Sequence, residues 1–114
     1  MSAYDLEIGD DDAGVIVASL AGELDLTNAR ELEERLDSAA ASDTVLVIDI
    51  NRVVFIDSAA LHVLFKLAKG RPNDRFVLLM GPTAAVSRTL DIVRMKDAVV
   101  ILASLDDLER SGPG

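Results

Sequence analysis

Short apolar runs alternate with segments of helical periodicity along most of this chain, and no other feature constrains its fold as strongly. Residues 45–48 and 76–80 are continuous apolar runs, typical of strands that are covered on both faces. Elsewhere apolar side chains recur every three or four residues, which is the period of an amphipathic helix. A chain that alternates strands and helices in this way is expected to form a largely parallel sheet with helices packed on it.

The first part of the chain predicts two strands before the first helix. Residues 6–20 contain a polar break at 9–14, which indicates a hairpin-like pair of strands. Three successive aspartates in the break, residues 10–12, indicate a solvated turn, because the alternating ligands and the distal glutamate of a calcium loop are missing. The expected order is ββαβαβαβα, an α/β fold with a mixed, mostly parallel β-sheet. It is expected to form a single domain over residues 1–114, with an ordered part of about 4–110.

Four helices are expected, each recognised by its apolar face or by its first residues. The inner face of the first consists of Ala29, Leu32, Leu36 and Ala39. The second begins at Ser58, and its inner face consists of Leu61, Leu64, Phe65 and Ala68. The third starts at residues 81–83, Gly-Pro-Thr, and its inner face consists of Val86, Leu90 and Val93. After a last strand at 98–102, residues 104–107 resemble a capping box that opens a short final helix.

Composition removes most catalytic and metal chemistry. The 114 residues contain no cysteine and a single histidine, which excludes thiolate chemistry, zinc–cysteine sites and multi-histidine metal sites. The glycines match neither a dinucleotide-binding fingerprint nor a phosphate loop. We therefore expect no metal, no cofactor and no catalytic residue in this chain.

Charge and hydropathy exclude two classes of partner. Twenty Asp and Glu against eleven Lys and Arg give a net charge of −9, without a basic stripe that could follow a phosphate backbone. Nucleic acids and anionic membranes are therefore not expected as partners. The sequence does not open with a basic segment followed by an apolar stretch, and no apolar run approaches ~18 residues. These features predict a cytoplasmic domain.

Ser58 is the residue best placed for chemistry, because a helix is expected to begin there with its first backbone N–H groups unpartnered. Asp57 and Ser58 are both preferred N-cap residues, so capping alone is one interpretation. In a second interpretation Ser58 accepts a phosphoryl group, whose charge the free amides and the helix dipole would stabilise. A hydrolase triad of Asp57, Ser58 and His62 is disfavoured, because the serine lacks a Gly-x-Ser-x-Gly context and no oxyanion hole is indicated.

A second segment of interest is residues 22–25, with the sequence Gly-Glu-Leu-Asp, just before the first helix. One interpretation is a strand-to-helix turn in which Asp25 or Thr27 caps that helix. In the other interpretation Asp25 lies beside Ser58 in a binding site. Both residues precede helices, and open α/β sheets place their sites at the carboxyl ends of the strands.

Together these segments resemble a known family. Residues 45–64 combine an apolar strand that reaches an aspartate, a short apolar bridge and an Asp-Ser pair at the start of a helix. This pattern resembles the hallmark of the STAS domain in bacterial anti-sigma factor antagonists. Residues 22–25 and 81–86 resemble the family's other two signatures, in the same order. The resemblance spans approximately residues 4–110.

The resemblance implies a regulatory binding protein that is not an enzyme. Such a protein binds an anti-sigma factor, typically a serine kinase with a GHKL-type ATP site, and so frees a sigma factor. The kinase then phosphorylates the motif serine, here Ser58, which ends the complex, and a serine phosphatase restores binding. The acidic members of the implied surface predict a basic partner surface. The whole surface comprises Glu23, Asp25, Thr27, Asp57, Ser58, Ala59, Leu61 and His62.

Three positions depart from the family's motif. Ala59 replaces its second hydroxyl residue, and Ala60 and His62 replace its glycines, whereas the serine is retained as Ser58. The replaced glycines change how closely a partner's backbone approaches this helix, and His62 is a candidate for redirecting partner choice. An alternative function is a STAS module that is never phosphorylated and serves as a scaffold or small-ligand sensor in a larger signalling assembly.

Overall fold

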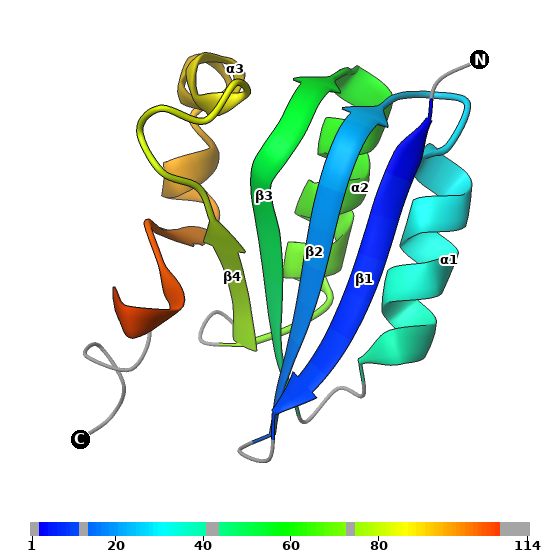
Figure 1. Cartoon of the computed structure of the whole chain (residues 1–114), viewed down its shortest axis with the longest axis vertical. Helices are drawn as coiled ribbons and strands as arrows, with labels where there is room; N and C mark the ends of the chain where they lie inside the picture. The colour runs from blue at the N-terminus through cyan, green and yellow to red at the C-terminus, as the bar shows by residue number, and fades with distance from the viewer. Residues whose placement is uncertain (1–2, 12–13, 41–43, 73–74, 108–114) are drawn as a thin grey trace.

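The computed structural model describes residues 3–11, 14–40, 44–72 and 75–107, which form a five-stranded sheet with α1 and α2 on one face (Figure 1). The elements in chain order are β1 (Tyr4–Asp11), β2 (Val15–Leu24), α1 (Ala29–Ala39), β3 (Val45–Ile56), α2 (Ser58–Lys69), β4 (Phe76–Leu79), α3 (Ser87–Ile92), the 3₁₀ helix η2 (Met95–Asp97) and β5 (Val100–Leu102). The strands lie side by side in sequence order. The predicted α/β fold with strands and helices in alternation is confirmed.

Only the first pair of strands is antiparallel, as the predicted hairpin requires. The pairs β2–β3, β3–β4 and β4–β5 are parallel, because a helix or a longer connection carries the chain back each time. The carboxyl ends of β2 and β3 therefore meet at the same edge of the sheet, where α1 and α2 begin. This arrangement brings residues 25–28 close to residue 57.

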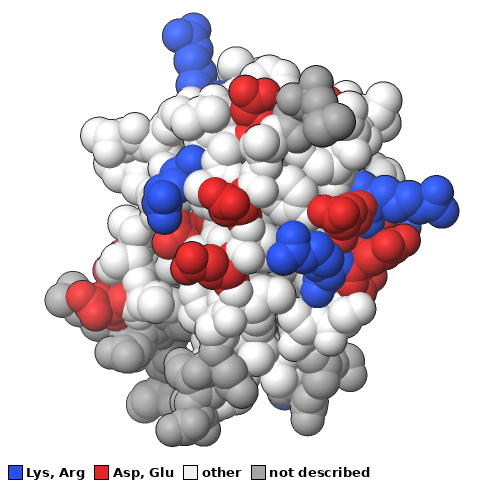
Figure 2. Space-filling view, turned by 45° about the vertical axis from the view of Figure 1, so that its right-hand side comes forward, with Lys and Arg blue, Asp and Glu red and all other residues white. Residues whose placement is uncertain are grey.

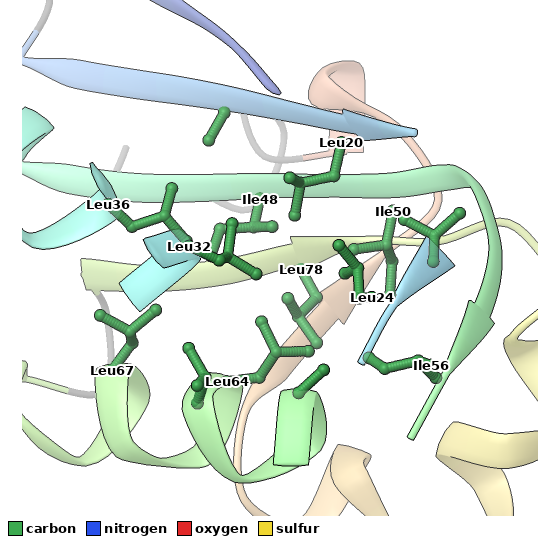
Figure 3. Packing of buried hydrophobic residues seen from close by; sticks show 14 of the residues in the cluster. Leu20, Leu24, Leu32, Leu36, Ile48, Ile50, Ile56, Leu64, Leu67 and Leu78 are labelled. Atoms are coloured by element: carbon green, nitrogen blue, oxygen red, sulfur yellow. The ribbon is translucent and has the colours of Figure 1, made fainter. Parts of the chain in front are cut away.

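The main core lies between the sheet and the two long helices (Figure 3). Leu20, Ile48 and Leu78 project from three neighbouring strands toward this side, and all three are almost completely buried. Leu32 of α1 and Leu64 of α2 pack against them without measurable exposure. Each such side chain contributes roughly 1.5–3 kcal/mol through apolar burial. The helices are thus fixed on the sheet by the apolar faces that their periodicity predicted.

A smaller cluster of Val47, Val77 and Leu79 is buried on the opposite face of the sheet. Strands β3 and β4 alternate between the two clusters, so every side chain along their central parts needs to be apolar. This explains why residues 45–48 and 76–80 are continuous apolar runs in the sequence.

Strands β2 and β3 both run further than their apolar runs predicted. Residues 22–24 continue β2 instead of forming a turn. Strand β3 continues past its apolar run, from Asp49 to its end at Ile56. Two register shifts in the β2–β3 ladder accommodate this extension, in which polar and exposed apolar residues replace the continuous apolar pattern. The extension of β3 still contributes to the main core, because Ile50, Val53 and Ile56 along it are buried.

The third helix begins at Ser87, several residues later than predicted, and turns occupy residues 82–86. The Asn51 side-chain carbonyl accepts a hydrogen bond from the Gly81 N–H at 2.7 Å, which ties the start of this connection to β3. Val86 and Leu90 are buried as expected, but Val93 is exposed because α3 ends before it.

Some predictions fall partly on residues outside those that the structure describes. Of the three aspartates, Asp10 and Asp11 belong to β1, and Asp12 lies outside the described residues. The backbone is helical over residues 105–107, in agreement with the predicted final helix, whose remainder lies outside them. So do residues 108–110 of the expected ordered part.

Tyr4 ties β1 to α1 at the edge of the sheet. Its hydroxyl donates a hydrogen bond to a Glu31 carboxylate oxygen at 2.6 Å and accepts one from Arg35 at 3.1 Å. Partial burial, together with the hydrogen bond to Glu31, raises the pKa of Tyr4 above its usual value of 10.0. The neutral phenol is therefore the form that the folded chain favours.

We expect a side chain at Gly22 to destabilise the fold more than a side chain at the other glycines compared below. Its φ is +94°, and a Cβ atom there would lie 2.5 Å from the Ala3 carbonyl oxygen. That oxygen is held in place by a hydrogen bond from the Glu23 N–H at 3.0 Å, so it cannot move away easily. We expect Gly22→Ala to lower the free energy of unfolding by about 2–4 kcal/mol, measured by urea denaturation.

Two other glycines separate the causes of this loss. Gly14 also has a positive φ, +78°, but a Cβ atom there would meet no other atom within 4 Å, so Gly14→Ala tests backbone strain alone. Gly9 has neither feature, and its nearest contact would be at 4.0 Å. We expect a loss of about 1 kcal/mol for Gly14→Ala and almost none for Gly9→Ala. Equal losses at all three positions would contradict the explanation.

Candidate functional site

The start of α2 is fixed by the side chain that precedes it. Asp57 has extended backbone angles, and its Oδ1 accepts a hydrogen bond from the Ala60 N–H at 3.0 Å. This is the N-cap geometry predicted for the Asp-Ser pair, with the aspartate as the cap. Ser58 is consequently left as the first helical residue, with an exposed side chain that is not needed for capping.

Asp57 also joins this helix to the loop between β2 and α1. Its second carboxylate oxygen, Oδ2, accepts a hydrogen bond from the Leu26 N–H at 3.0 Å. Its own N–H donates to the Leu24 carbonyl oxygen at 3.1 Å. The two segments singled out in the sequence, 22–25 and 57–58, therefore meet at one edge of the sheet, as the parallel topology predicted.

The β2–α1 loop is held by hydrogen bonds of its own. The Asp25 Oδ1 atom accepts from the Thr27 N–H at 2.9 Å and from the Thr27 hydroxyl. Asn28, which is buried, accepts from the Asp25 N–H at 3.0 Å and donates to the Glu23 carbonyl oxygen at 2.9 Å. The prediction that Asp25 or Thr27 caps α1 is wrong, because the residue at the N-cap position is Asn28 and its side chain bonds backward into the loop.

Three exposed apolar side chains lie close in sequence to this junction, and periodicity did not single them out. Leu26 is 77% exposed, Val54 63% and Phe55 50%. We call this set the apolar rim. Leu26 adjoins Asp57 through its backbone hydrogen bond, and Phe55 pairs in register with Glu23. The sequence does contain a signal for Leu26. It is an apolar residue between Asp25 and Thr27, in a turn where an apolar side chain is not expected to be buried.

The arrangement does not provide a hydrolytic triad. Both Asp57 carboxylate oxygens accept hydrogen bonds from backbone amides, and neither accepts one from His62 in the part of the chain that the structure describes. His62 lies one helical turn beyond Ser58 on the exposed side of α2, and within the described residues no hydrogen bond joins the two. What the site offers is an exposed hydroxyl at a helix N-terminus beside an apolar surface.

Neither a metal centre nor a membrane span is found in the part of the chain that the structure describes. No group of three or more His, Cys, Asp or Glu residues there could hold a metal ion. None of its helices is long and apolar enough to cross a membrane. On the face shown in Figure 2, acidic and basic side chains are interspersed, and the Lys and Arg residues do not form a continuous stripe.

The geometry of this site agrees with the family resemblance, and a direct comparison of the sequence with known families establishes which family it is. Residues 9–108 match the STAS domain family. The chain belongs to this family. The match covers both segments that meet at residue 57 as well as the connection after β4.

Known relatives of this STAS domain include antagonists of anti-sigma factors. Over 55 residues it is 44% identical to the anti-sigma-F factor antagonist RsfB of Mycobacterium tuberculosis, a match that covers 47% of this chain and 45% of that protein. The aligned part thus spans less than half of the relative. The crystal structure of an anti-sigma factor antagonist from Mycobacterium paratuberculosis has a TM-score of 0.82 at 27% identity, covering 96% of this chain and 93% of the other. The anti-sigma factor antagonist SpoIIAA, in its unphosphorylated form, shares the fold with a TM-score of 0.71 at 14% identity, covering 93% and 95%.

The residues of the predicted partner surface differ in accessibility. The exposed members are Glu23, Thr27, Ser58 and His62. The half-buried members are Asp25, Asp57 and Ala59. Leu61 is only 8% exposed and packs in the main core, so its assignment to a contact surface needs correction. In this STAS domain it can support the site only from beneath.

Proposed function

We propose that this STAS domain is an anti-sigma factor antagonist whose partner is an anti-sigma factor of the serine-kinase type, and that phosphorylation of Ser58 switches it off. Binding would release the sigma factor that the anti-sigma factor holds. The observation that supports this most directly is the exposed Ser58 side chain at the first position of a helix whose cap is supplied by Asp57. The similarity to RsfB and to the mycobacterial antagonist structure supports the choice of partner class.

In the proposed contact surface, Ser58 and the three side chains of the apolar rim lie in the middle, and polar residues lie around them. An apolar centre surrounded by polar groups is the composition that interfaces most often show. Leu26 and Phe55 join the predicted contact residues, and Leu61 is removed from them because it is buried. Glu23 and His62 lie on the accessible border, where charge contributes more to partner choice than to affinity.

Phosphorylation would act on this surface without refolding the domain. A phosphate at Ser58 adds about −1.5 to −2 charges at the N-terminus of α2, where the helix dipole stabilises negative charge. The Asp57 and Glu23 carboxylates already make this edge acidic. A partner that covers Ser58 would have to desolvate the phosphate beside them, so the complex would separate while the fold stays intact.

In this proposal the chain supplies a hydroxyl, and its partners supply the catalysis. The anti-sigma factor acts as the kinase, and a serine phosphatase acting on phosphorylated Ser58 restores binding. The chain itself is proposed to have no enzymatic activity and to act in the cytoplasm, where sigma factors and their regulators meet. Its single domain is proposed to extend over residues 1–114.

The modification is tested by incubating the purified chain with an anti-sigma factor kinase that binds it and with ATP, followed by mass spectrometry. We expect one phosphate, on Ser58, and no phosphate on the Ser58→Ala variant. A chain that binds the kinase stably but stays unmodified would contradict the switch and would favour the scaffold function.

Leu26 is predicted to be an anchor of the contact. Its side chain is 77% exposed, so Leu26→Asp should leave the stability of the domain almost unchanged. We expect this variant to bind the anti-sigma factor about 10- to 100-fold more weakly by isothermal titration calorimetry, because a central apolar contact is replaced by a charge. Ile8→Asp is the control, since Ile8 is also exposed, at 44%, but lies in the middle of β1. Loss of binding in both variants, or in neither, would remove Leu26 from the contact surface.

A further inference from the structure

His62 lies one helical turn after Ser58 on the outward side of α2. Both residues are exposed, whereas Ala60 and Leu61 between them are buried. On a helix, residues four positions apart have their Cβ atoms about 5–6 Å from each other. Helical side chains also tilt toward the N-terminus of their helix, so the His62 imidazole extends over the turn that begins at Ser58. A group added to the Ser58 oxygen is therefore within reach of this imidazole.

In the part of the chain that the structure describes, neither of these two side chains has a hydrogen-bond or ion-pair partner. Their position on the helix does not account for a histidine either. His62 is exposed, and histidine forms helices less readily than alanine or leucine. A positive charge is also better placed at the C-terminal end of α2, where Lys66 and Lys69 lie, than at the fifth of its twelve residues. A negative charge on Ser58 would reverse this balance, because it would give His62 an anionic neighbour.

Charged side chains on the elements next to His62 are bonded to each other. Lys66, one turn further along α2, forms an ion pair with Glu33 of α1 at 2.9 Å. At η2, whose following residue lines the same hollow as His62, Arg94 and Asp97 pair with each other at 2.8 Å. Further charged groups are Glu23, Asp25 and Asp57 on the side of Ser58, and Lys69 and Arg71 where α2 ends. Both Asp57 carboxylate oxygens accept backbone N–H groups, at 3.0 Å each.

We propose that His62 binds the phosphate of phosphorylated Ser58, with its protonated imidazole donating a hydrogen bond to a phosphate oxygen. This pairing rests on the proposed function, and it names the residue of this chain that the modification contacts. A phosphate offers three acceptor oxygens, and a hydrogen bond between charged groups is roughly twice as strong as one between neutral groups. One positive charge balances only part of a phosphate, which carries about −1.5 to −2 charges, so the junction at Asp57 stays acidic.

The pair makes the modified surface sensitive to pH. The second ionisation of a phosphoserine lies near pH ~6, and histidine side chains change charge between about pH 5 and 8. A protonated His62 favours the dianionic phosphate, so it lowers the pH at which the phosphate loses its second proton. As the pH rises toward about 8, His62 becomes neutral while the phosphate keeps its full charge, which strengthens the repulsion of a partner.

The test uses the full chain with phosphoserine incorporated at residue 58 during translation, so that no kinase is needed, and follows its ³¹P NMR signal between about pH 5 and 8. We expect the apparent midpoint of the phosphate titration to be about 0.5 pH unit higher in His62→Gln than in the chain that retains His62. His62→Lys should keep the midpoint low, because it supplies a positive charge at the same position. An unchanged midpoint in His62→Gln, or a His62→Lys variant that titrates like His62→Gln, would overturn the proposal.

Lys69→Gln is the matched control, since it also removes an exposed positive charge from α2. Lys69 lies eleven residues from Ser58, about 16 Å along the helix axis, so its loss should move the midpoint by less than about 0.1 pH unit. A shift as large as that of His62→Gln would show a general effect of charge and would reject the pair. This result is separate from that of the proposed function, because the phosphoserine is introduced without a kinase. A chain that its kinase leaves unmodified contradicts the switch, whereas a midpoint that does not depend on His62 contradicts only the pair.

Discussion

Phosphorylated Ser58 is expected to bind the anti-sigma factor at least about 100-fold more weakly than the unmodified chain, the largest effect predicted for this protein. Ser58→Asp should weaken binding about tenfold, because aspartate adds a single charge and no tetrahedral group. Ser58→Ala should bind as tightly as wild type and should continue to bind when ATP is present. The three forms thus separate the charge at this position from the hydroxyl itself.

The size of this effect follows from where Ser58 lies. Its side chain is exposed at the first position of α2, one residue from the Asp57 carboxylate and beside the Leu26 loop. A partner that covers the apolar rim would also cover Ser58, so the phosphate would lose its water within an acidic and partly apolar contact. Removing charge from water without a matched partner costs several kcal/mol, which is enough for this change in affinity.

Binding is measured by isothermal titration calorimetry with the purified anti-sigma factor, using a nonhydrolysable ATP analogue for the unmodified forms. Ser38→Asp is the matched control, since Ser38 is an exposed serine in the last turn of α1, away from the junction at Asp57. It should bind like wild type. If Ser58→Asp and phosphorylated Ser58 also bind like wild type, the switch is wrong, whatever the mass spectrum shows.

The fold could be predicted from the sequence because its helices and central strands carry their burial pattern in their periodicity. Leu32 and Leu36 recur at helical spacing on α1, and both are buried against the sheet. Leu61 and Leu64 do the same on α2. The apolar runs of β3 and β4 likewise reflect burial on both faces. The end of β3 could not be predicted in this way, because its buried residues Val53 and Ile56 are three positions apart, which is not the strand period of two, and its pairing with β2 shifts register.

The site could be predicted only in part, for two physical reasons. Parallel topology was sufficient to bring the loop at Asp25 next to the start of α2, and capping preference was sufficient to predict a cap at the Asp57–Ser58 pair, although not which of the two supplies it. The exposure of Leu26 and Phe55 depends on which face of a loop or strand end reaches solvent, which periodicity does not determine. Leu61 shows the opposite problem: its helical spacing placed it inside, and the family motif placed it on the surface.

Asp57 is expected to link the stability of this site to its proposed function, and its substitution is the second prediction with a large effect. One carboxylate oxygen caps α2 through the Ala60 N–H, and the other holds the Leu26 N–H, each at 3.0 Å. Asp57→Ala removes both acceptors and should lower the free energy of unfolding by about 2–4 kcal/mol. Asp57→Asn keeps the cap, since asparagine is an equally good N-cap residue, but turns an amide group toward Leu26. The free energy of unfolding of Asp57→Asn should therefore fall by only about 1–2 kcal/mol.

The Asp57→Asn variant tests whether the loop must be held for binding, because Ser58 and the Leu26 side chain both remain. We expect the Leu26 amide to exchange its hydrogen faster, and the affinity for the anti-sigma factor to fall about five- to tenfold at a temperature where circular dichroism shows the variant folded. Asp91→Asn is the control, since Asp91 is exposed on α3 and should leave both quantities unchanged. Faster exchange at Leu26 with unchanged affinity would show that Asp57 stabilises the loop without positioning it. Unchanged exchange would show that the Asp57 carboxylate does not hold the loop at all.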